Sequence, residues 1–239
     1  MEVKRSRSWF RARWVPDAVI FDLDGVLVDT MPLWREAETT VFGALGVPID
    51  EAGLAQTAGM STGAVTRFWH MRHPWSAPPL ADVEAAVVAR VQDLVRQQGR
   101  PMPGALRLID EARAVTGRIG VATNSPRTLA MLTLDAALGP RRLDGVATVD
   151  CVASPKPAPD VYLEAARQLG VLPRTCLAID DSPHGIRAAL EAGMVAVGIC
   201  THGASMDAFA GAHVVVDSPA ALDLAAVLAA LRRAPPHPR

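Results

Sequence analysis

Cysteine is scarce in this chain of 239 residues, which contains only three, Cys151, Cys176 and Cys200. Their number is odd and their spacing is wide, so they match neither a zinc-binding pattern nor the disulfide framework of a small secreted domain. Three reduced, buried thiols in a cytoplasmic protein are the simplest interpretation.

An excess of either charge is missing as well, since 24 Lys and Arg residues stand against 25 Asp and Glu residues and the formal net charge is −1. A nearly neutral chain has no general field that draws nucleic acid or an anionic membrane to it. We therefore expect a small-molecule partner, with no nucleic acid and no membrane. Residues 1–16 are a local exception, and we interpret this basic segment as a solvated N-terminal extension.

Long apolar runs are also absent. No stretch approaches the roughly 18 residues that a membrane-spanning helix needs, and the first residues lack the apolar segment of a signal peptide. Hydrophobic residues nevertheless make up 50% of the chain, which is enough for one sizeable core and a smaller appended unit. We expect a soluble, cytoplasmic protein that is a monomer.

Short apolar segments alternate with segments of helical spacing along most of the chain. Strands are predicted at Ala18–Leu23, Ile119–Ala122, Val146–Val149, Cys176–Ile179, Val195–Ile199 and Val214–Val216. Helices are predicted at Ala105–Val115, Arg127–Leu138, Pro159–Gly170, Pro183–Ala192 and Ala220–Leu231. This alternation is typical of an α/β fold whose core is a Rossmann-like, doubly wound parallel sheet.

Residues 32–103 break the alternation, because they carry helical spacing throughout, at Leu33–Leu45, Ala64–Met71 and Ala81–Gln98. We interpret this stretch as a helical cap inserted after the first strand. Pro101 and Pro103 mark the return of the chain to the core. The α/β core then consists of residues 17–31 and 104–239.

Pairs of acidic residues follow two of the predicted strands. Asp22 and Asp24 end the first strand in FDLDGVLVDT, and Asp180 and Asp181 end another in AIDDS. Because open α/β sheets bind ligands at the carboxyl ends of their strands, these carboxylates can meet at one edge. Magnesium suits such a group, since it takes few carboxylates and keeps room for waters and phosphate oxygens.

Two further strand ends supply the remaining parts of a phosphoryl-transfer site. Thr123 and Asn124 follow IGVA, and Lys156 lies in SPKPAPD. Phosphoryl transfer depends on positioning and charge neutralisation, so a hydroxyl, exposed amides, a lysine and a metal are the groups it requires. Each residue alone is more often a turn, a helix cap or a surface lysine, and only the joint pattern favours chemistry.

The motifs DLDGVLVDT, VATNS, KPAPD and IDDS, in this order, resemble the four motifs of the haloacid dehalogenase superfamily, over residues 17–231. The resemblance implies that Asp22 is a nucleophile that forms an aspartyl-phosphate and that Asp24 is a general acid and then a base. It implies that Thr123 donates a hydrogen bond to the phosphate and that Lys156 holds Asp22 and the phosphoryl oxygens.

The same resemblance implies a magnesium site. Asp22, the backbone carbonyl of Asp24, and Asp181 with or through Asp180 are its implied ligands. Asp24 also disfavours a dehalogenase, because a halide leaves without a proton. The absence of lysine from residues 32–103 disfavours a phosphonatase, which forms an imine on a cap lysine.

Within the superfamily, DTMPLW, FWHMRHPW and VATNSP are similar to segments of the phosphatases that act on 2-deoxyglucose 6-phosphate and hexitol phosphates. The β-phosphoglucomutases are also similar, but they carry a histidine and a phosphate-binding arginine where this chain has Trp34 and Ser61. That difference favours hydrolysis. Met31 and Ser61 also depart from the phosphatases, which have Glu and Arg there.

The sequence therefore predicts magnesium-dependent hydrolysis of a small phosphomonoester, a sugar or sugar-alcohol phosphate, with a sugar phosphomutase as the alternative. A catalytically inactive phosphate-binding regulator is a third hypothesis. The predicted substrate contacts are Thr123, Asn124, Lys156, Trp34, Ser61 and Arg72. Four aromatic residues, Trp34, Phe68, Trp69 and Trp75, form either a wall for the sugar or simply the core of the cap.

Overall fold

The computed structural model describes residues 14–139, 143–201 and 206–233, and the basic segment predicted at residues 1–16 lies almost wholly outside them. Within the described residues, one parallel sheet has the strand order β3-β2-β1-β4-β5-β6. The strands are β1 (Ala18–Phe21), β2 (Ile119–Ala122), β3 (Gly145–Ala147), β4 (Cys176–Asp180), β5 (Val195–Ile199) and β6 (Val214–Val216). The predicted doubly wound α/β fold is confirmed.

The first strand lies at the centre of the sheet, where the strand order reverses. Val19 is in register with Ile119 of β2 on one side and with Leu177 of β4 on the other. All four residues of β1 are buried, which explains why the strand has a continuous apolar sequence rather than an alternating one. The carboxyl ends of β1 and β4 therefore lie side by side, at the switch point where ligands bind in such sheets.

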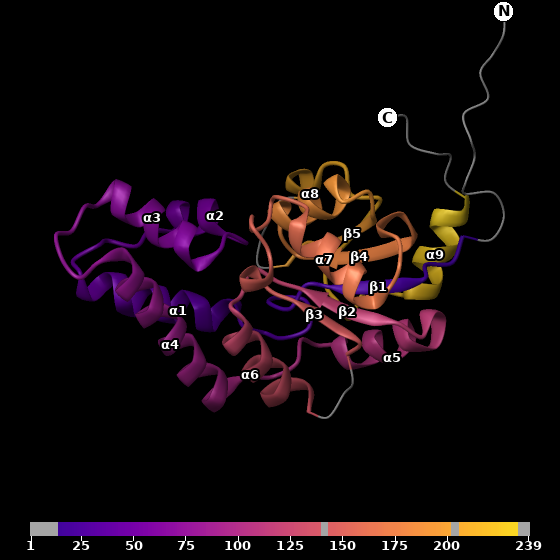
Figure 1. The fold of residues 1–239 in the computed structure, drawn as a ribbon, viewed down its shortest axis with the longest axis horizontal. Helices are drawn as coiled ribbons and strands as arrows, with labels where there is room; N and C mark the ends of the chain where they lie inside the picture. The colour runs from indigo at the N-terminus through magenta and orange to yellow at the C-terminus, as the bar shows by residue number, and fades with distance from the viewer. Residues whose placement is uncertain (1–13, 140–142, 202–205, 234–239) are drawn as a thin grey trace, which may run out of the picture.

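Helices cover both faces of the sheet (Figure 1). Val19 and Phe21 belong to a hydrophobic cluster with residues of α5 (Ala105–Thr116), α6 (Arg127–Leu138) and α9 (Leu224–Arg233). Ala18 and Ile20 belong to the opposite cluster, with residues of α7 (Asp160–Leu169) and α8 (Pro183–Glu191). Alternate residues of β1 thus contribute to two separate layers of core.

The last helix begins later than the predicted start at Ala220. The guanidinium of Arg107 donates hydrogen bonds to the carbonyls of Pro219, Ala220 and Leu222, which holds this segment outside the helix. Asp223 then accepts from the amide of Ala226 at 2.9 Å, as an N-cap residue does.

Four helices follow β1 and lie to one side of the sheet (Figure 1). They are α1 (Met31–Ala44), α2 (Glu51–Thr57), α3 (Thr62–Arg72) and α4 (Leu80–Gln98). Residues of α1, α3 and α4 form a further hydrophobic cluster with Leu129 and Leu132 of α6, and its largest fully buried side chain is that of Trp69. We refer to α1–α4 as the four-helix segment.

The short helix α2 was not predicted. Its N-cap is Asp50, whose carboxylate accepts a hydrogen bond from the amide of Gly53 at 2.6 Å. A Cβ atom on Gly53 would lie 2.2 Å from the ring of Trp69, so the helix depends on close packing against α3. Seven residues are too few to form an isolated helix, and tertiary contacts decide this one.

Two further observations concern the predicted environment. Within the described part of the chain, helices that combine the length and the apolar character needed to cross a membrane are absent. All three cysteines are free thiols, but the prediction that they are buried holds only for Cys176, because Cys151 is exposed.

Candidate active site

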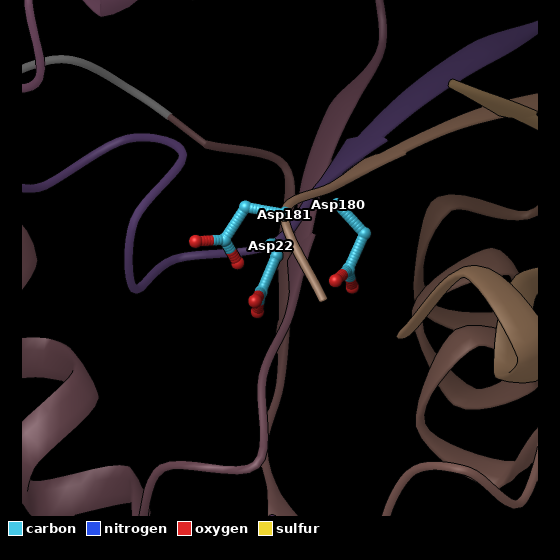
Figure 2. Close-up of side chains that lie close together, drawn as sticks. All are labelled: Asp22, Asp180 and Asp181. Carbon is cyan, nitrogen blue, oxygen red and sulfur yellow. The ribbon is translucent and has the colours of Figure 1, made fainter. Parts of the chain in front are cut away.

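Asp22 follows β1 directly and is still held by the sheet, since its amide donates to the carbonyl of Ile179 at 2.8 Å. Asp180 is the last residue of the neighbouring strand β4, and Asp181 follows it. Figure 2 shows these three carboxylates close together at the strand ends. One oxygen of each lies within 4.8 Å of the others, a separation that a single cation can bridge.

Lys156 lies between two of these carboxylates. Its Nζ atom is 2.8 Å from Oδ1 of Asp22 and 2.7 Å from Oδ2 of Asp180. The lysine is 3% exposed. Burial favours the neutral amine, but the charges of Asp180 and Asp22 outweigh it and raise the pKa of Lys156 above its ordinary value. The side chain is therefore a fixed cation.

The carboxylate of Asp180 is fully buried and accepts four hydrogen bonds. Oδ2 accepts from Lys156 and from the hydroxyl of Tyr162, each at 2.7 Å. Oδ1 accepts from the amide of Ser182 at 2.9 Å and from its hydroxyl at 2.8 Å. Burial acts to raise the pKa of Asp180, but Lys156 and these hydrogen bonds lower it below its ordinary value. Its four lone-pair directions are occupied.

The other two carboxylates have fewer protein partners. Burial is the main cause that raises the pKa of Asp22 to about 7, and the neighbouring charges of Asp180 and Asp24 add to it. Burial, together with Asp22 and Asp180, raises the pKa of Asp181 well above its ordinary value. A buried and a half-buried carboxylate that disfavour ionisation so strongly fit a site for a hard divalent cation, which would restore the charged forms.

Glycine at two positions leaves room for this cluster. A Cβ atom on Gly25 would lie 1.9 Å from Oδ2 of Asp181, and one on Gly185 would lie 1.8 Å from Oδ2 of Asp180. Gly25 also has φ of +77°, which lets the chain turn sharply after Asp24.

Asp24 projects from this turn and accepts four hydrogen bonds of its own. Oδ1 accepts from Thr30 Oγ1 at 2.6 Å and from the indole Nε1 of Trp34 at 3.1 Å. Oδ2 accepts from Ser125 Oγ at 2.7 Å and from Thr123 Oγ1 at 3.3 Å. The carboxylate is therefore oriented by residues from both the four-helix segment and the sheet.

Asn124 connects three parts of the site. Its amide Nδ2 donates to the carbonyl of Gly59 at 2.9 Å and to that of Lys156 at 3.3 Å. Its Oδ1 accepts from the amide of Lys156 at 2.9 Å. His184 adds a second link to the four-helix segment, with Nδ1 lying 3.1 Å from the carbonyl of Ala58. The turn between α2 and α3 is thus held against two strand-end loops.

A cavity of about 680 Å³ lies between this edge of the sheet and the four-helix segment. Seven of the predicted site residues line it: Asp22, Asp24, Trp34, Thr123, Asn124, Lys156 and Asp181. Asp180 does not line the cavity, but it contacts Lys156, which does.

The structure does not bring Ser61 and Arg72 into this cavity. The neighbours of Ser61, Met60 and Thr62, line the cavity, whereas Ser61 is a buried N-cap residue. Arg72 ends the same helix, α3, ten residues and therefore about 15 Å beyond Thr62. Its guanidinium lies 3.7 Å from Asp50 and 5.8 Å from the ring of Phe68.

Of the aromatic residues in and beside the four-helix segment, some line the cavity and others do not. Trp34 lines the cavity, while Phe68, Trp69 and Trp75 pack in the hydrophobic cluster of the four-helix segment. Phe68 and Trp69 meet edge to face with their ring centroids 5.2 Å apart. The interpretation as plain core is therefore confirmed for these three.

Four residues at the site were missed by the sequence reasoning, namely Thr30, Ser125, Tyr162 and Glu38. Ser125 lies in the motif VATNS and Thr30 in the motif DLDGVLVDT, so their positions could have indicated hydroxyl groups at the site. Tyr162 is the only tyrosine of the chain, and a buried phenol needs a hydrogen-bond partner. Glu38 lies outside the four motifs, so its place at the site could not be predicted from them.

The carboxyl of Glu38 predicts a pH-dependent stability. Burial raises its pKa from 4.5 to about 7, so the folded state keeps a proton that the unfolded state releases across that range. The free energy of unfolding should therefore fall as pH rises from 4.5 to 7. We expect Glu38→Gln to be more stable than the parent protein by about 3 kcal/mol above pH 7, with no difference near pH 4.5.

Denaturant unfolding at pH 5 and pH 8 measures this effect. The matched control is Glu36→Gln, on the same helix, whose carboxylate is exposed and pairs with Arg90 at 2.7 Å. Other buried acids are common to all three proteins and cancel from the comparison. A stability gain for Glu38→Gln that is the same at both pH values would contradict the titration.

Known proteins are similar to this chain in sequence and in fold. The family model described as haloacid dehalogenase-like hydrolase matches residues 16–193. Hexitol phosphatase B of Escherichia coli K12 is 35% identical over 183 residues, which cover 74% of this chain and 80% of that protein. Fructose-1-phosphate phosphatase YqaB of the same strain is 33% identical over 189 residues, which cover 76% of this chain and 95% of that protein.

A solved structure is similar over almost its whole length. The crystal structure of CbbY from Rhodobacter sphaeroides in complex with phosphate has a TM-score of 0.78 and 32% sequence identity. The similarity covers 90% of this chain and 99% of that chain.

Proposed function

The chain belongs to the haloacid dehalogenase-like hydrolase family, and from this we propose that it is a magnesium-dependent phosphatase acting on a sugar or sugar-alcohol phosphate through an aspartyl-phosphate. One observation carries the proposal: Asp22, Asp24, Thr123, Lys156 and Asp181 all line one cavity. A hexitol phosphatase and a fructose-1-phosphate phosphatase among the relatives support the substrate class.

Asp22 is the proposed nucleophile. Lys156 holds Oδ1 at 2.8 Å, which leaves the other carboxylate oxygen to attack phosphorus as the bond to the leaving oxygen breaks. Asp22, Asp181 and the backbone carbonyl of Asp24 would hold magnesium, which would supply positive charge that favours ionised Asp22 and neutralises the phosphoryl oxygens. Asp180 acts by positioning Lys156 rather than as a direct ligand, because its oxygens already accept four hydrogen bonds.

Asp24 is the proposed general acid and base. It protonates the leaving oxygen during formation of the phospho-Asp22 enzyme and then takes a proton from the water that attacks phosphorus. The hydroxyls of Thr30 and Ser125 and the indole of Trp34 hold its carboxylate in place. The indole N–H donates without titrating, so this contact persists at all working pH values.

Thr123, Asn124 and Lys156 are the proposed contacts of the transferred phosphoryl group. They follow two different strands and lie around the cavity beside Asp22. We further propose that the four-helix segment acts as a cap that excludes water from this group while the leaving group departs.

Hydrolysis is favoured over mutase chemistry by the charges of the cavity. A mutase needs a cation for the phosphate that is not being transferred. Among the residues that line the cavity, the cations are Lys156 and Arg35, and Arg35 forms an ion pair with Glu51. Ser61, at the position where we expected that arginine, does not line the cavity.

Magnesium removal is the direct test of this proposal. We expect the protein to release phosphate from hexitol phosphates and sugar phosphates with magnesium, and to lose at least about 100-fold of this rate in chelator. Calcium should not restore the rate, because its larger and looser coordination shell spoils the line of attack by Asp22. Chelator with excess magnesium is the control, and equal rates with both ions would contradict the proposed role.

The mutase alternative is tested with β-glucose 1-phosphate and a catalytic amount of the bisphosphate. Glucose 6-phosphate and free phosphate are followed together in one reaction. Isomerisation that exceeds phosphate release tenfold, a difference of about 1.4 kcal/mol in barrier height, would overturn the phosphatase in favour of the mutase.

A further inference from the structure

Glu38 is a buried acid whose role the proposed reaction does not explain. It lies on α1, is 8% exposed and lines the same cavity as Asp22. Among the described residues, no hydrogen bond or charge offsets the burial that raises the pKa of its carboxyl group. A carboxyl group that burial makes costly to ionise and that faces a cavity is unusual for a structural residue.

The position of Glu38 relative to the reacting groups follows from the helix. Trp34 lies four residues earlier on α1, so the two side chains occupy one face about 6 Å apart along the axis. The indole of Trp34 is 3.1 Å from Oδ1 of Asp24. Glu38 therefore lies one helical turn beyond Trp34, which contacts Asp24, and both side chains line the cavity.

The surroundings of Glu38 on the cap side of the cavity are mainly apolar. Met31, Leu54, Ala55, Met60 and Val65 line this part. The hydroxyl of Thr57, which also lines the cavity, already donates to the carbonyl of Gly53 at 3.0 Å. A bound substrate can therefore supply the hydrogen-bond donors that these apolar neighbours do not offer to Glu38.

The substrate that fits has several hydroxyl groups and no second negative charge. The other charged cap residues at the cavity, Arg35 and Glu51, pair with each other, so no net positive charge offsets Glu38. A second phosphate near Glu38 would meet a like charge, whereas hydroxyls can donate to a carboxylate. Burial raises the pKa of Glu38 to about 7, and hydroxyl groups can also accept from its protonated form.

We propose that Glu38 binds the hydroxyl groups of a neutral polyol or sugar at the end remote from its phosphate, and that it selects against substrates with a second phosphate there. This inference rests on the proposed phosphatase function and adds a specificity residue to it. A site built to hydrogen-bond substrate hydroxyls strongly disfavours analogues that lack them.

The test compares kcat/KM for sorbitol 6-phosphate, p-nitrophenyl phosphate and fructose 1,6-bisphosphate in the parent protein, Glu38→Gln and Glu38→Leu. We expect the ratio of sorbitol 6-phosphate to p-nitrophenyl phosphate to fall at least about tenfold in Glu38→Leu, mainly through KM. The ratio of the bisphosphate to sorbitol 6-phosphate should rise in both variants. Glu36→Gln, on the exposed side of α1, should change neither ratio.

The outcomes separate the two proposals. Absence of phosphate release from all three compounds by the parent protein would refute the phosphatase function itself. Phosphate release with both ratios unchanged in the variants would refute the role of Glu38 alone. Thermal unfolding checks that each variant is folded. If Glu38→Leu does not fold, the test relies on Glu38→Gln, which preserves the shape of the side chain.

Discussion

Asp22→Asn is expected to abolish turnover, with kcat lower by at least about 1000-fold for every phosphomonoester that the parent protein hydrolyses. An amide oxygen is a poor nucleophile toward phosphorus and a poor ligand for magnesium. The substitution changes neither the size of the side chain nor the hydrogen bond from the Asp22 amide to Ile179. Phosphate release with magnesium at saturating substrate measures the effect.

The Asp22→Asn variant should remain folded, and its metal-free form should not lose stability at alkaline pH. Burial raises the pKa of Asp22 to about 7, above its value of 3.8 in the unfolded chain, so the ionised carboxylate destabilises the metal-free protein above pH 7. We therefore expect metal-free Asp22→Asn to be at least as stable as the parent at pH 8. Magnesium should raise the unfolding temperature of the parent more than that of the variant.

Asp82→Asn is the matched control, because Asp82 is an exposed aspartate on α4. It should keep full activity. Near-normal phosphate release by Asp22→Asn, with a folded protein, would mean that another residue or a water attacks phosphorus, and the aspartyl-phosphate mechanism would be wrong.

The positions of β1, β2, β4 and β5 could be predicted because each is a short apolar run that is buried along its whole length. Val195–Ile199 and Ile119–Ala122 appear in the structure with the predicted bounds. Their order in the sheet could not be read from periodicity, because the pairing of β1 with β4 joins residues that are far apart in sequence. The strand order was therefore not predicted, whereas the motifs indicated the family and the alternation of strands and helices indicated the fold, and both are confirmed.

The misses share a physical cause. Helix α2 depends on contact between Gly53 and Trp69, and the late start of α9 depends on Arg107, which bonds to carbonyls more than a hundred residues away. The direction of Glu38 into the cavity likewise depends on how α1 lies beside the sheet. Local patterns contain none of these long-range contacts, and the assigned site roles stay predictions until variants are measured.

Lys156→Met should have the second large effect, on both activity and stability. Lys156 is one of only two lysines in the chain, and its Nζ atom lies between Asp22 and Asp180 at 2.8 and 2.7 Å. Methionine fills a similar volume without a charge, so two buried carboxylates lose the cation between them. Removing one partner of a buried ion pair costs about 3–5 kcal/mol, because it leaves an uncompensated charge.

The loss of stability should depend on pH in a defined direction. The folded-state pKa of Asp22 is already raised to about 7, and the loss of Lys156 raises it further, so Asp22 is protonated in the variant at pH 5. The free energy of unfolding should therefore be closer to that of the parent at pH 5 than at pH 8. Denaturant titrations of both proteins at the two pH values measure this.

A double variant separates the structural effect from the catalytic one. In Lys156→Met with Asp180→Asn, one of the two uncompensated charges is removed, so stability at pH 8 should recover in part. Activity should not recover, because the cation beside Asp22 and the phosphoryl group is still absent, and we expect kcat to stay at least about 100-fold below the parent. A double variant that regains both stability and turnover would show that Lys156 only balances buried charge, and that the phosphoryl oxygens are neutralised by other groups.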